Sequence, residues 1–343
     1  MPPADSPAPP PPAAASPFHP GEQAVQARAG VRERAERLGQ RMIRDAMPDQ
    51  HRDFYRQLPM LVAGSVDGEG RPWASLLVGR PGFAGSPDPR TLIVGARPAA
   101  DDPLAAGLAV GAPVGLLGIQ LETRRRNRVN GTVAGVGPLG FTLRVDQSFG
   151  NCPQYIQVRV PEFRRDPRQH VPGPALRADA LSAEAAALVA RADTFFIATT
   201  AGGADAATGV DVSHRGGRPG FVAVSREGGR TVLTFPDFAG NAQFNTLGNV
   251  AATGRAGLLF VDFAGGATLQ VTGAAAIVWE GPALAAFAGA ERLVRVEVEA
   301  ALWRADAVPL RWSAPEFAPQ LAATGTWPEA GAQVSPAIRN AAM

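Results

Sequence analysis

Apolar and polar residues follow two different periods along this chain. Residues 24–47 carry apolar side chains at helical spacing, with Arg and Glu between them, which predicts a helix. Pro48 ends that pattern, and a shorter helix is expected over 49–55. From residue 60 onward, short apolar runs alternate with Gly-rich turns, which predicts many short strands. A helical pattern returns only once more with clear signals, at 182–191, after a serine suited to cap it.

The sequence contains an internal repeat. The pentapeptide GRPGF occurs at 79–83 and again at 217–221, an offset of 138 residues. Four further landmarks recur in the same order, namely a serine six residues before PGF (Ser75 and Ser213), an Arg-Thr pair (90–91 and 230–231), a GLL triplet (115–117 and 257–259) and the glycine of a V-x-G motif (Gly131 and Gly273). Five landmarks in one order indicate a duplicated unit of about 140 residues, which is too long for a solenoid repeat.

Each copy opens with a helix and continues as short strands separated by Gly-rich turns, a pattern typical of small barrels. We therefore expect a mainly β fold with flanking helices, in which two tandem β-barrel domains form a pseudo-dimer within one chain. The expected boundaries are a disordered Pro-rich tail over 1–17, a first barrel over 18–165, a linker over 166–180, a second barrel over 181–315 and a C-terminal tail over 316–343.

Charge and composition exclude several functions. The 343 residues carry 33 basic and 31 acidic side chains, a net charge of +2. So small a balance, with most arginines scattered, gives no case for nucleic acid. Every basic residue is an arginine, which excludes a lysine Schiff base or a lysine general base. Cys152 is the only cysteine, so no intrachain disulfide and no cysteine-rich metal site is expected.

Targeting signals are not evident in the sequence. No apolar run approaches the roughly 20 residues of a membrane span. The Pro-rich first 17 residues lack the charged and apolar regions of a secretory signal. We therefore expect a cytoplasmic protein that does not bind a membrane.

Polar residues of the second copy are concentrated over 211–249. Ser213, Arg215 and the glycines that follow bring together a hydroxyl, a guanidinium and backbone N–H groups, which are the groups that bind phosphate. The alternative is that 213–217 is a solvated hairpin turn, with the nearby asparagines satisfying turn backbones.

Amide and aromatic side chains that suit a heteroaromatic ring follow in the same copy, namely Asn241, Asn245, Gln270, Phe235 and Phe244. Such a ring needs a few donors and acceptors in a mostly apolar wall. The composition therefore favours a phosphorylated flat heterocycle, bound in the groove between the two barrels.

Other motifs favour structural interpretations. The segment GVGPLG (135–140) matches the spacing G-x-G-x-x-G, but the internal proline and the strand after it favour a plain turn.

The histidines lack metal-ligand spacing, so no metal site is expected, and only His214 is a candidate for ligand contact. The arginine run 124–128 either meets a phosphate or forms a solvated edge strand. Cys152 fits a turn residue better than a redox thiol.

Several pieces of the chain together resemble a known family, namely FHPGE (18–22), GNCPQYIQ (150–157), DVSHRGGRPGF (211–221), LTFPDFAGN (233–241), FNTLGN (244–249) and RAGLLFVDF (255–263). They resemble the pyridoxamine 5′-phosphate oxidase-like, FMN-binding split-barrel proteins, and most of all a tandem subgroup described as flavin-nucleotide-binding. The resemblance covers roughly residues 18–315. It implies six-stranded split barrels with flanking helices, and FMN at the interface between two barrels.

The same resemblance assigns cofactor-binding residues. It implies a phosphate near Ser213, His214 and Arg215. The rest of the flavin is implied near residues of the following strand, turn and helix and of one later strand, namely Thr234, Phe235, Pro236, Asp237, Asn241, Phe244, Asn245 and Gln270. From the first copy it adds Asn151, Tyr155 and Gln157.

One departure from the family affects the expected reaction. The amine oxidases of the family carry a basic motif ending in a lysine, and Phe221-Val222 stands at that place, so vitamin B6 oxidation is not expected. We expect an FMN-dependent oxidoreductase that accepts electrons from a donor such as NADH or NADPH, with the redox chemistry on the cofactor. The alternatives are a flavin or haem module without turnover and a barrel pair without a ligand. No residue indicates a catalytic acid or base, and further homodimerisation stays open.

Overall fold

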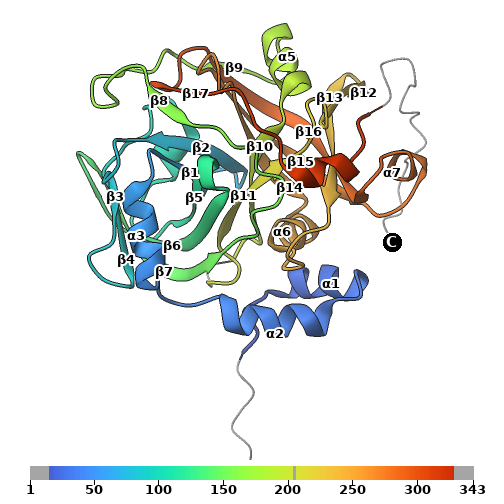
Figure 1. Cartoon of the computed structure of the whole chain (residues 1–343), viewed down its shortest axis with the longest axis horizontal. Coiled ribbons are helices and arrows are strands. Elements are labelled where there is room, and N and C mark those ends of the chain that lie inside the picture. The colour runs from blue at the N-terminus through green and yellow to red at the C-terminus, as the bar shows by residue number, and fades with distance from the viewer. Residues whose placement is uncertain (1–14, 204–205, 328–343) are drawn as a thin grey trace, which may run out of the picture.

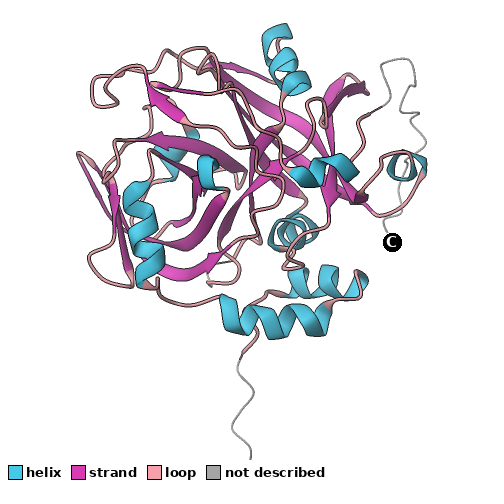
Figure 2. Cartoon of the chain, viewed as in Figure 1, coloured by secondary structure: helices cyan, strands magenta, loops and turns pink. Residues whose placement is uncertain are grey.

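The computed structural model describes residues 15–203 and 206–327, so most of the tail expected over 1–17 lies outside the described residues. The fold is mainly β, with two large antiparallel sheets side by side and helices at the periphery (Figures 1 and 2). No helix among the described residues has the length and apolar character needed to cross a membrane.

The first sheet has the order β2-β1-β5-β6-β7-β4-β3. Its strands are β1 Met60–Val66, β2 Pro72–Val78, β3 Ala84–Gly85, β4 Thr91–Val94, β5 Pro113–Gln120, β6 Arg125–Gly137 and β7 Gly140–Gly150.

The second sheet has the order β11-β10-β14-β15-β16-β13-β12, with β9 paired to β16. Its strands are β9 Leu176–Ala178, β10 Thr194–Thr200, β11 Val210–Gly216, β12 Ala223–Glu227, β13 Arg230–Phe238, β14 Arg255–Val261, β15 Thr268–Val278 and β16 Ala290–Arg304. The strands β1 to β7 correspond in sequence to β10 to β16. Corresponding strands stand in the same order in the two sheets. The two sheets therefore bear out the duplication predicted from the repeated landmarks, with seven strands in the first and eight in the second, against the six implied by the family.

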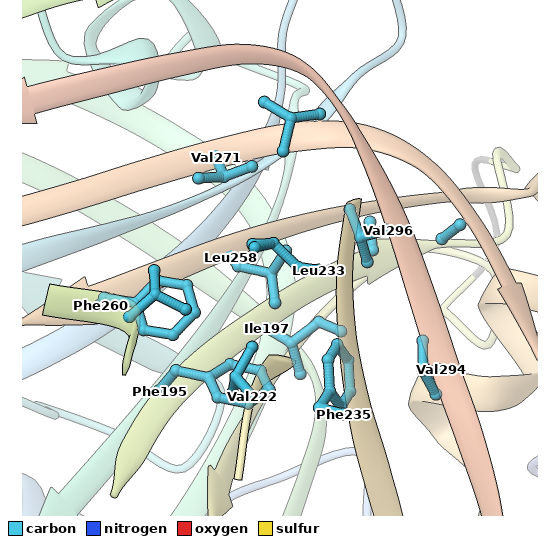
Figure 3. Close-up of a cluster of buried hydrophobic side chains, with 14 of the residues drawn as sticks. Phe195, Ile197, Val222, Leu233, Phe235, Leu258, Phe260, Val271, Val294 and Val296 are labelled. Atoms are coloured by element: carbon cyan, nitrogen blue, oxygen red, sulfur yellow. The ribbon is translucent and has the colours of Figure 1, made fainter. Parts of the chain in front are cut away.

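The innermost strands are apolar on both faces because each of them serves two cores. On β1, Leu61 lies in the core of the first sheet and Val62 in a core shared with the second sheet. On β10, Phe195 belongs to the core of the second sheet, shown in Figure 3, and Phe196 to the shared core. Since side chains alternate along a strand, a continuous apolar run is what two-sided burial requires.

Each sheet curls around its own core. In the first unit, β2 and β3 stand at opposite ends of the strand order, yet Leu77 and Ala84 pack in one cluster. No ladder joins these two strands within 15–203 and 206–327, so the barrel has an open seam. The chain is therefore a tandem pair of split β-barrels, as expected.

The two units meet as a pseudo-dimer. A Cβ on Gly115 would lie 2.3 Å from the carbonyl oxygen of Val210, and one on Gly257 would lie 2.2 Å from that of Pro72. Gly115 and Gly257 are the repeated glycines of GLL, and each approaches the corresponding backbone of the other unit. The interface is thus self-complementary, as in a twofold dimer.

The helices lie around the two sheets, with α1 and α2 next to α6 (Figure 1). They are α1 Pro20–Arg28, α2 Arg32–Met42, α3 Asp49–Gln57, α4 Pro103–Gly107, α5 Ala183–Arg191, α6 Asn245–Thr253 and α7 Pro282–Ala285, with short 3₁₀ turns at Leu121–Thr123 and Pro319–Ala323. The single helix predicted over 24–47 is wrong. Gly30, with φ of +71°, breaks it into α1 and α2, since helical backbone has negative φ.

Two segments expected to be loose are packed. The expected linker over 166–180 contributes β9, which pairs with β16. Just before the linker, β8, Pro161–Phe163, pairs with β17, Leu310–Trp312. In the expected C-terminal tail, residues 316–327 lie against the barrels, and Trp327 Nε1 donates to the Phe221 carbonyl at 2.9 Å. Burial of Leu321 and neighbouring apolar side chains accounts for this packing.

Candidate functional site

A cavity of about 430 Å³ lies where the two units and the N-terminal helices meet. The first unit contributes β6 and the turn after β7, and the second contributes β11, the end of β13, the loop before α6 and the start of that helix. The turn between α1 and α2 completes the wall. Binding sites at domain interfaces commonly have this construction.

Eight of the eleven residues expected to bind a cofactor line this cavity, namely Ser213, His214, Arg215, Pro236, Asp237, Asn241, Phe244 and Asn245. Three do not. Phe235 is fully buried in the core of the second barrel, and Thr234 is buried without lining the cavity. Gln270 lies in a different pocket, where its Nε2 donates to Ser75 Oγ at 2.9 Å.

Of the residues implied from the first copy, Asn151 and Tyr155 line the cavity, whereas Gln157 does not. Gln157 instead accepts a hydrogen bond from the Ala318 amide at 2.8 Å. Cys152, interpreted as a turn residue, also lines the cavity, and no strand or helix includes it.

The arginine run is not an edge strand. Strand β6 lies between β5 and β7, and it brings Arg126 and Arg128 to the cavity wall. The sequence is compatible with both alternatives, because a strand's place in a sheet is decided by pairing with distant segments. Two more lining arginines, Arg34 of α2 and Arg292 of β16, had no recognised signal in the sequence.

Arg128 connects the first barrel to the second. Its Nη1 donates to Asp211 Oδ1 at 2.8 Å and to Asn245 Oδ1 at 3.1 Å. Its Nη2 donates to the hydroxyl of Ser213. The side chain is almost fully buried, and its guanidinium lies over the ring of Phe149. A buried arginine held on several sides is pre-organised to present its remaining N–H group.

Arg126 bonds only to carbonyl oxygens. Its Nε donates to the Cys152 carbonyl at 2.7 Å and its Nη1 to the His214 carbonyl at 3.3 Å. Burial, together with the neighbouring Arg215 and Arg128, lowers the pKa of Arg126 to about 9. It is therefore still charged at neutral pH, and a bound anion would compensate that charge.

The remaining arginines share few carboxylates. Arg215 Nη2 lies 3.6 Å from Asp237 Oδ1, while Arg292 Nε donates to Asp237 Oδ2 at 3.0 Å. One carboxylate thus serves two guanidiniums, although Arg292 also contacts Glu291. The cavity wall holds five arginines against two carboxylates, so its net charge is positive. The structure therefore favours an anionic ligand.

Unpartnered buried donors are concentrated in the same wall. Arg128 Nε, Arg215 Nε and Asn151 Nδ2 are buried and have no hydrogen-bond partner among the residues that the structure describes. Buried polar groups are normally paired, so unpaired donors on residues that line a cavity favour a ligand rich in acceptors. Both ring nitrogens of His214 are also unpartnered, and burial, with Arg126 and Arg215 nearby, holds the pKa of His214 well below its usual value. His214 is therefore neutral.

The backbone geometry of the cavity wall also favours an anionic ligand. Helix α6 begins in the cavity wall, and no side chain caps its N-terminus, where free N–H groups favour an anion. Of the four non-glycine residues with positive φ in the described chain, Tyr155, Ala242 and Phe244 line the cavity. Strained backbone of this kind is found preferentially at functional sites.

The corresponding place in the other half is a smaller pocket of about 170 Å³. Gln270 occupies the position that Arg128 has in the cavity, and Thr268 the position of Arg126. None of the side chains lining this pocket has an unpartnered buried polar atom among the described residues. The two halves have thus diverged, and only one retains the free donors.

No protein-family model matches the chain, and neither does any curated protein. The similar solved structures include two of HupZ from Group A Streptococcus, one of them a single-substitution variant. The variant is 15% identical to this chain, and the match covers 36% of this chain and 98% of the variant's chain, with a TM-score of 0.27. The other is 16% identical to this chain, and the match covers 35% of this chain and 90% of that protein's chain, with a TM-score of 0.25. A likeness of this size carries no argument about function.

Proposed function

We propose that this protein binds FMN in the cavity between its two barrels and acts as an FMN-dependent oxidoreductase. The observation that carries the proposal is the set of unpartnered donors, Arg128 Nε, Arg215 Nε and Asn151 Nδ2, in a positively charged wall. FMN has a phosphate and a ring edge with carbonyl and imine acceptors, so it matches that donor set. The resemblance of the surrounding sequence to flavin-nucleotide-binding proteins supports the same cofactor.

The residues divide by chemistry into two groups. Arg126, Arg128, Ser213 and Arg215 would hold the phosphate, because charge-assisted bonds from guanidinium and hydroxyl groups are the strong phosphate contacts. Amide side chains such as Asn241 and the apolar Pro236, Phe238 and Phe244 would contact the ring.

The protein's part is to bind, orient and shield the cofactor. FMN, when bound, supplies two-electron redox chemistry that no side chain of this cavity has. His214 is a poor general base, because burial and the neighbouring Arg126 and Arg215 hold its pKa well below the usual value. We propose a reduced nicotinamide, NADH or NADPH, as the electron donor, because the positive wall also attracts its phosphates.

One observation favours a second candidate, a haem carrier without turnover. His214 presents a neutral imidazole in the cavity wall, and neutral imidazole is a common ligand of haem iron. The arginines that suit a phosphate would equally pair with carboxylates of a tetrapyrrole.

Titration of the protein with FMN and with riboflavin, followed by flavin fluorescence, tests the proposal. Riboflavin is the matched control because it lacks only the phosphate. We expect FMN to bind at least about tenfold more tightly, since one hydrogen bond to a charged group contributes about 1.5–3 kcal/mol. Equal affinities would contradict the phosphate assignment, and no binding of either would contradict the flavin.

Anaerobic addition of NADH or NADPH to the flavin-loaded protein then tests turnover. Bleaching of the flavin absorption is expected for the oxidoreductase. Failure of both donors to bleach it, with a Soret band on addition of haem, would favour the carrier instead.

A further inference from the structure

Glu22 of α1 has a buried carboxyl group next to the cavity, and the proposed function assigns no role to it. Its side chain is 3% exposed. One oxygen accepts from the His19 amide at 2.9 Å, and the other accepts from Asn245 Nδ2. The contact between α1 and α6 is close, because a Cβ on Gly248 would lie 2.4 Å from Glu22 Cγ. Glu22 is therefore held against the start of α6.

A hydrogen-bond chain leads from Glu22 into the cavity. Asn245 donates through Nδ2 to Glu22, which fixes the orientation of the amide and turns its Oδ1 toward Arg128. Arg128 in turn donates to Ser213. Glu22 does not line the cavity, so it acts on the ligand indirectly, through Asn245 and through its charge near Arg128.

The charged groups around Glu22 oppose one another, since Asp211 disfavours its ionised form and Arg128 favours it. His19, the N-cap residue of α1, places its Nε2 3.6 Å from a Glu22 oxygen, but burial lowers the pKa of His19. Asp211 lies on β11 and Arg128 on β6, while Asn245 and Asn249 of α6 are neutral. Arg128 is already bonded to Asp211 at 2.8 Å. Burial and the charge of Asp211 raise the pKa of Glu22 to about 8, although hydrogen bonds from the His19 amide and Asn245 oppose the shift. Glu22 is therefore mostly protonated at neutral pH.

We propose that Glu22 is a positioning residue for the anion site, and that its protonated form is the one that permits a phosphate to bind at Arg128. This inference rests on the proposed function, since it concerns the same site. An ionised Glu22 would add a second carboxylate beside Asp211 and weaken the attraction of Arg128 for the ligand. Binding of a phosphate and protonation of Glu22 therefore favour one another, and linkage makes the effect reciprocal.

Two consequences are measurable. Above pH 8, affinity for FMN falls by up to about tenfold per pH unit, because a proton must be taken up first. Riboflavin, without the phosphate, shows little of this dependence. In the Glu22→Gln variant, which mimics the neutral form, the affinity for FMN falls less steeply between pH 8 and 9 than in the wild type. The fall that remains comes from Arg126, whose pKa is about 9.

Infrared titration of the full-length protein tests the coupling directly. The carbonyl stretch of protonated Glu22, identified by its loss in Glu22→Gln, is followed against pH alone, with FMN and with inorganic phosphate. We expect both ligands to raise the pH at which the band disappears. If FMN binds and the band is unmoved, the inference is overturned while the proposed function stands.

If FMN does not bind, the proposed function fails, and inorganic phosphate decides the coupling: a raised midpoint supports it and an unmoved one overturns it. Should Glu22→Gln fail to fold, calorimetry of wild-type protein in two buffers of different ionisation enthalpy replaces the band assignment. Net proton uptake on FMN binding near pH 8 is expected, and no uptake would contradict the inference.

Discussion

The guanidinium of Arg128 on β6 donates a hydrogen bond to the hydroxyl of Ser213 on β11, across the boundary between the two barrels. The pseudo-twofold counterpart of this bond runs from Gln270 to Ser75. The hydroxyl has been retained in both halves, whereas the charge is present in one alone. This difference separates the proposed site from its counterpart.

We predict one FMN per chain. The pocket around Gln270 has no unpartnered buried donor, and Ser75 Oγ is already bonded to Asp102 at 2.6 Å. Calorimetric titration should give a molar ratio of one. A ratio of two would mean that both halves bind the cofactor, and that the divergence of Gln270 has no functional meaning.

Substitution Arg126→Gln is predicted to lower FMN affinity by about tenfold to a hundredfold, the effect of losing one or two charge-assisted hydrogen bonds. Its present partners are two carbonyl groups, so the fold should survive. The matched control is Arg125→Gln. Arg125 is the neighbouring residue on β6 and lies over Phe54, outside the cavity. Equal losses in the two variants would contradict a specific role for Arg126.

The close approach at the interface predicts a large effect of one methyl group. In Gly257→Ala the new Cβ would lie 2.2 Å from the Pro72 carbonyl oxygen, so the two barrels must separate locally. We expect the free energy of unfolding to fall by about 1–3 kcal/mol, as for other overpacked sites. Gly135→Ala on β6 is the control, because its Cβ would meet nothing within 4 Å. Urea unfolding of both variants measures the difference.

The lowered pKa of His51 predicts that the free energy of unfolding depends on pH. Burial, together with Arg125 and Arg44, lowers its pKa from 6.5 to about 4. Between these values the unfolded chain binds a proton that the folded chain does not, so the contribution of His51 to stability falls as pH drops from about 6.5 to about 4. Below that range both states are protonated and no further loss follows.

In His51→Gln the free energy of unfolding should therefore change less with pH over this range. Ser148→Ala is the matched comparison. It removes the hydroxyl that lies 3.0 Å from His51 Nδ1 but leaves the titrating ring, so its pH slope should stay close to that of the wild type. An unaltered slope in His51→Gln would contradict the interpretation.

The fold could be predicted from the sequence to a large extent because its constraints are local and repeated. The GLL glycines recur because Gly115 and Gly257 make the same contact from opposite sides. The glycines of the V-x-G motif recur for a similar reason, since both Gly131 and Gly273 follow a register shift in their strands. The repeated glycines therefore identify these positions from the sequence alone.

The site was predicted less completely, and the missing parts depend on tertiary structure. Whether β6 is a central or an edge strand depends on pairing with distant segments, so the role of Arg126 and Arg128 stayed open. Gln270 was placed in the site by resemblance, but the strand position that faces the cavity belongs to Arg128 of the other copy. Phe235 follows the alternation of β13 into the core, while the next two residues line the cavity.

The most direct test of the central claim is the visible absorption spectrum of the freshly purified protein, repeated on the supernatant after heat denaturation. The proposal predicts flavin bands that are released as FMN, or that appear when FMN is added to colourless protein. A protein that is colourless and takes up no added FMN would contradict it, and so would a Soret band in place of the flavin bands.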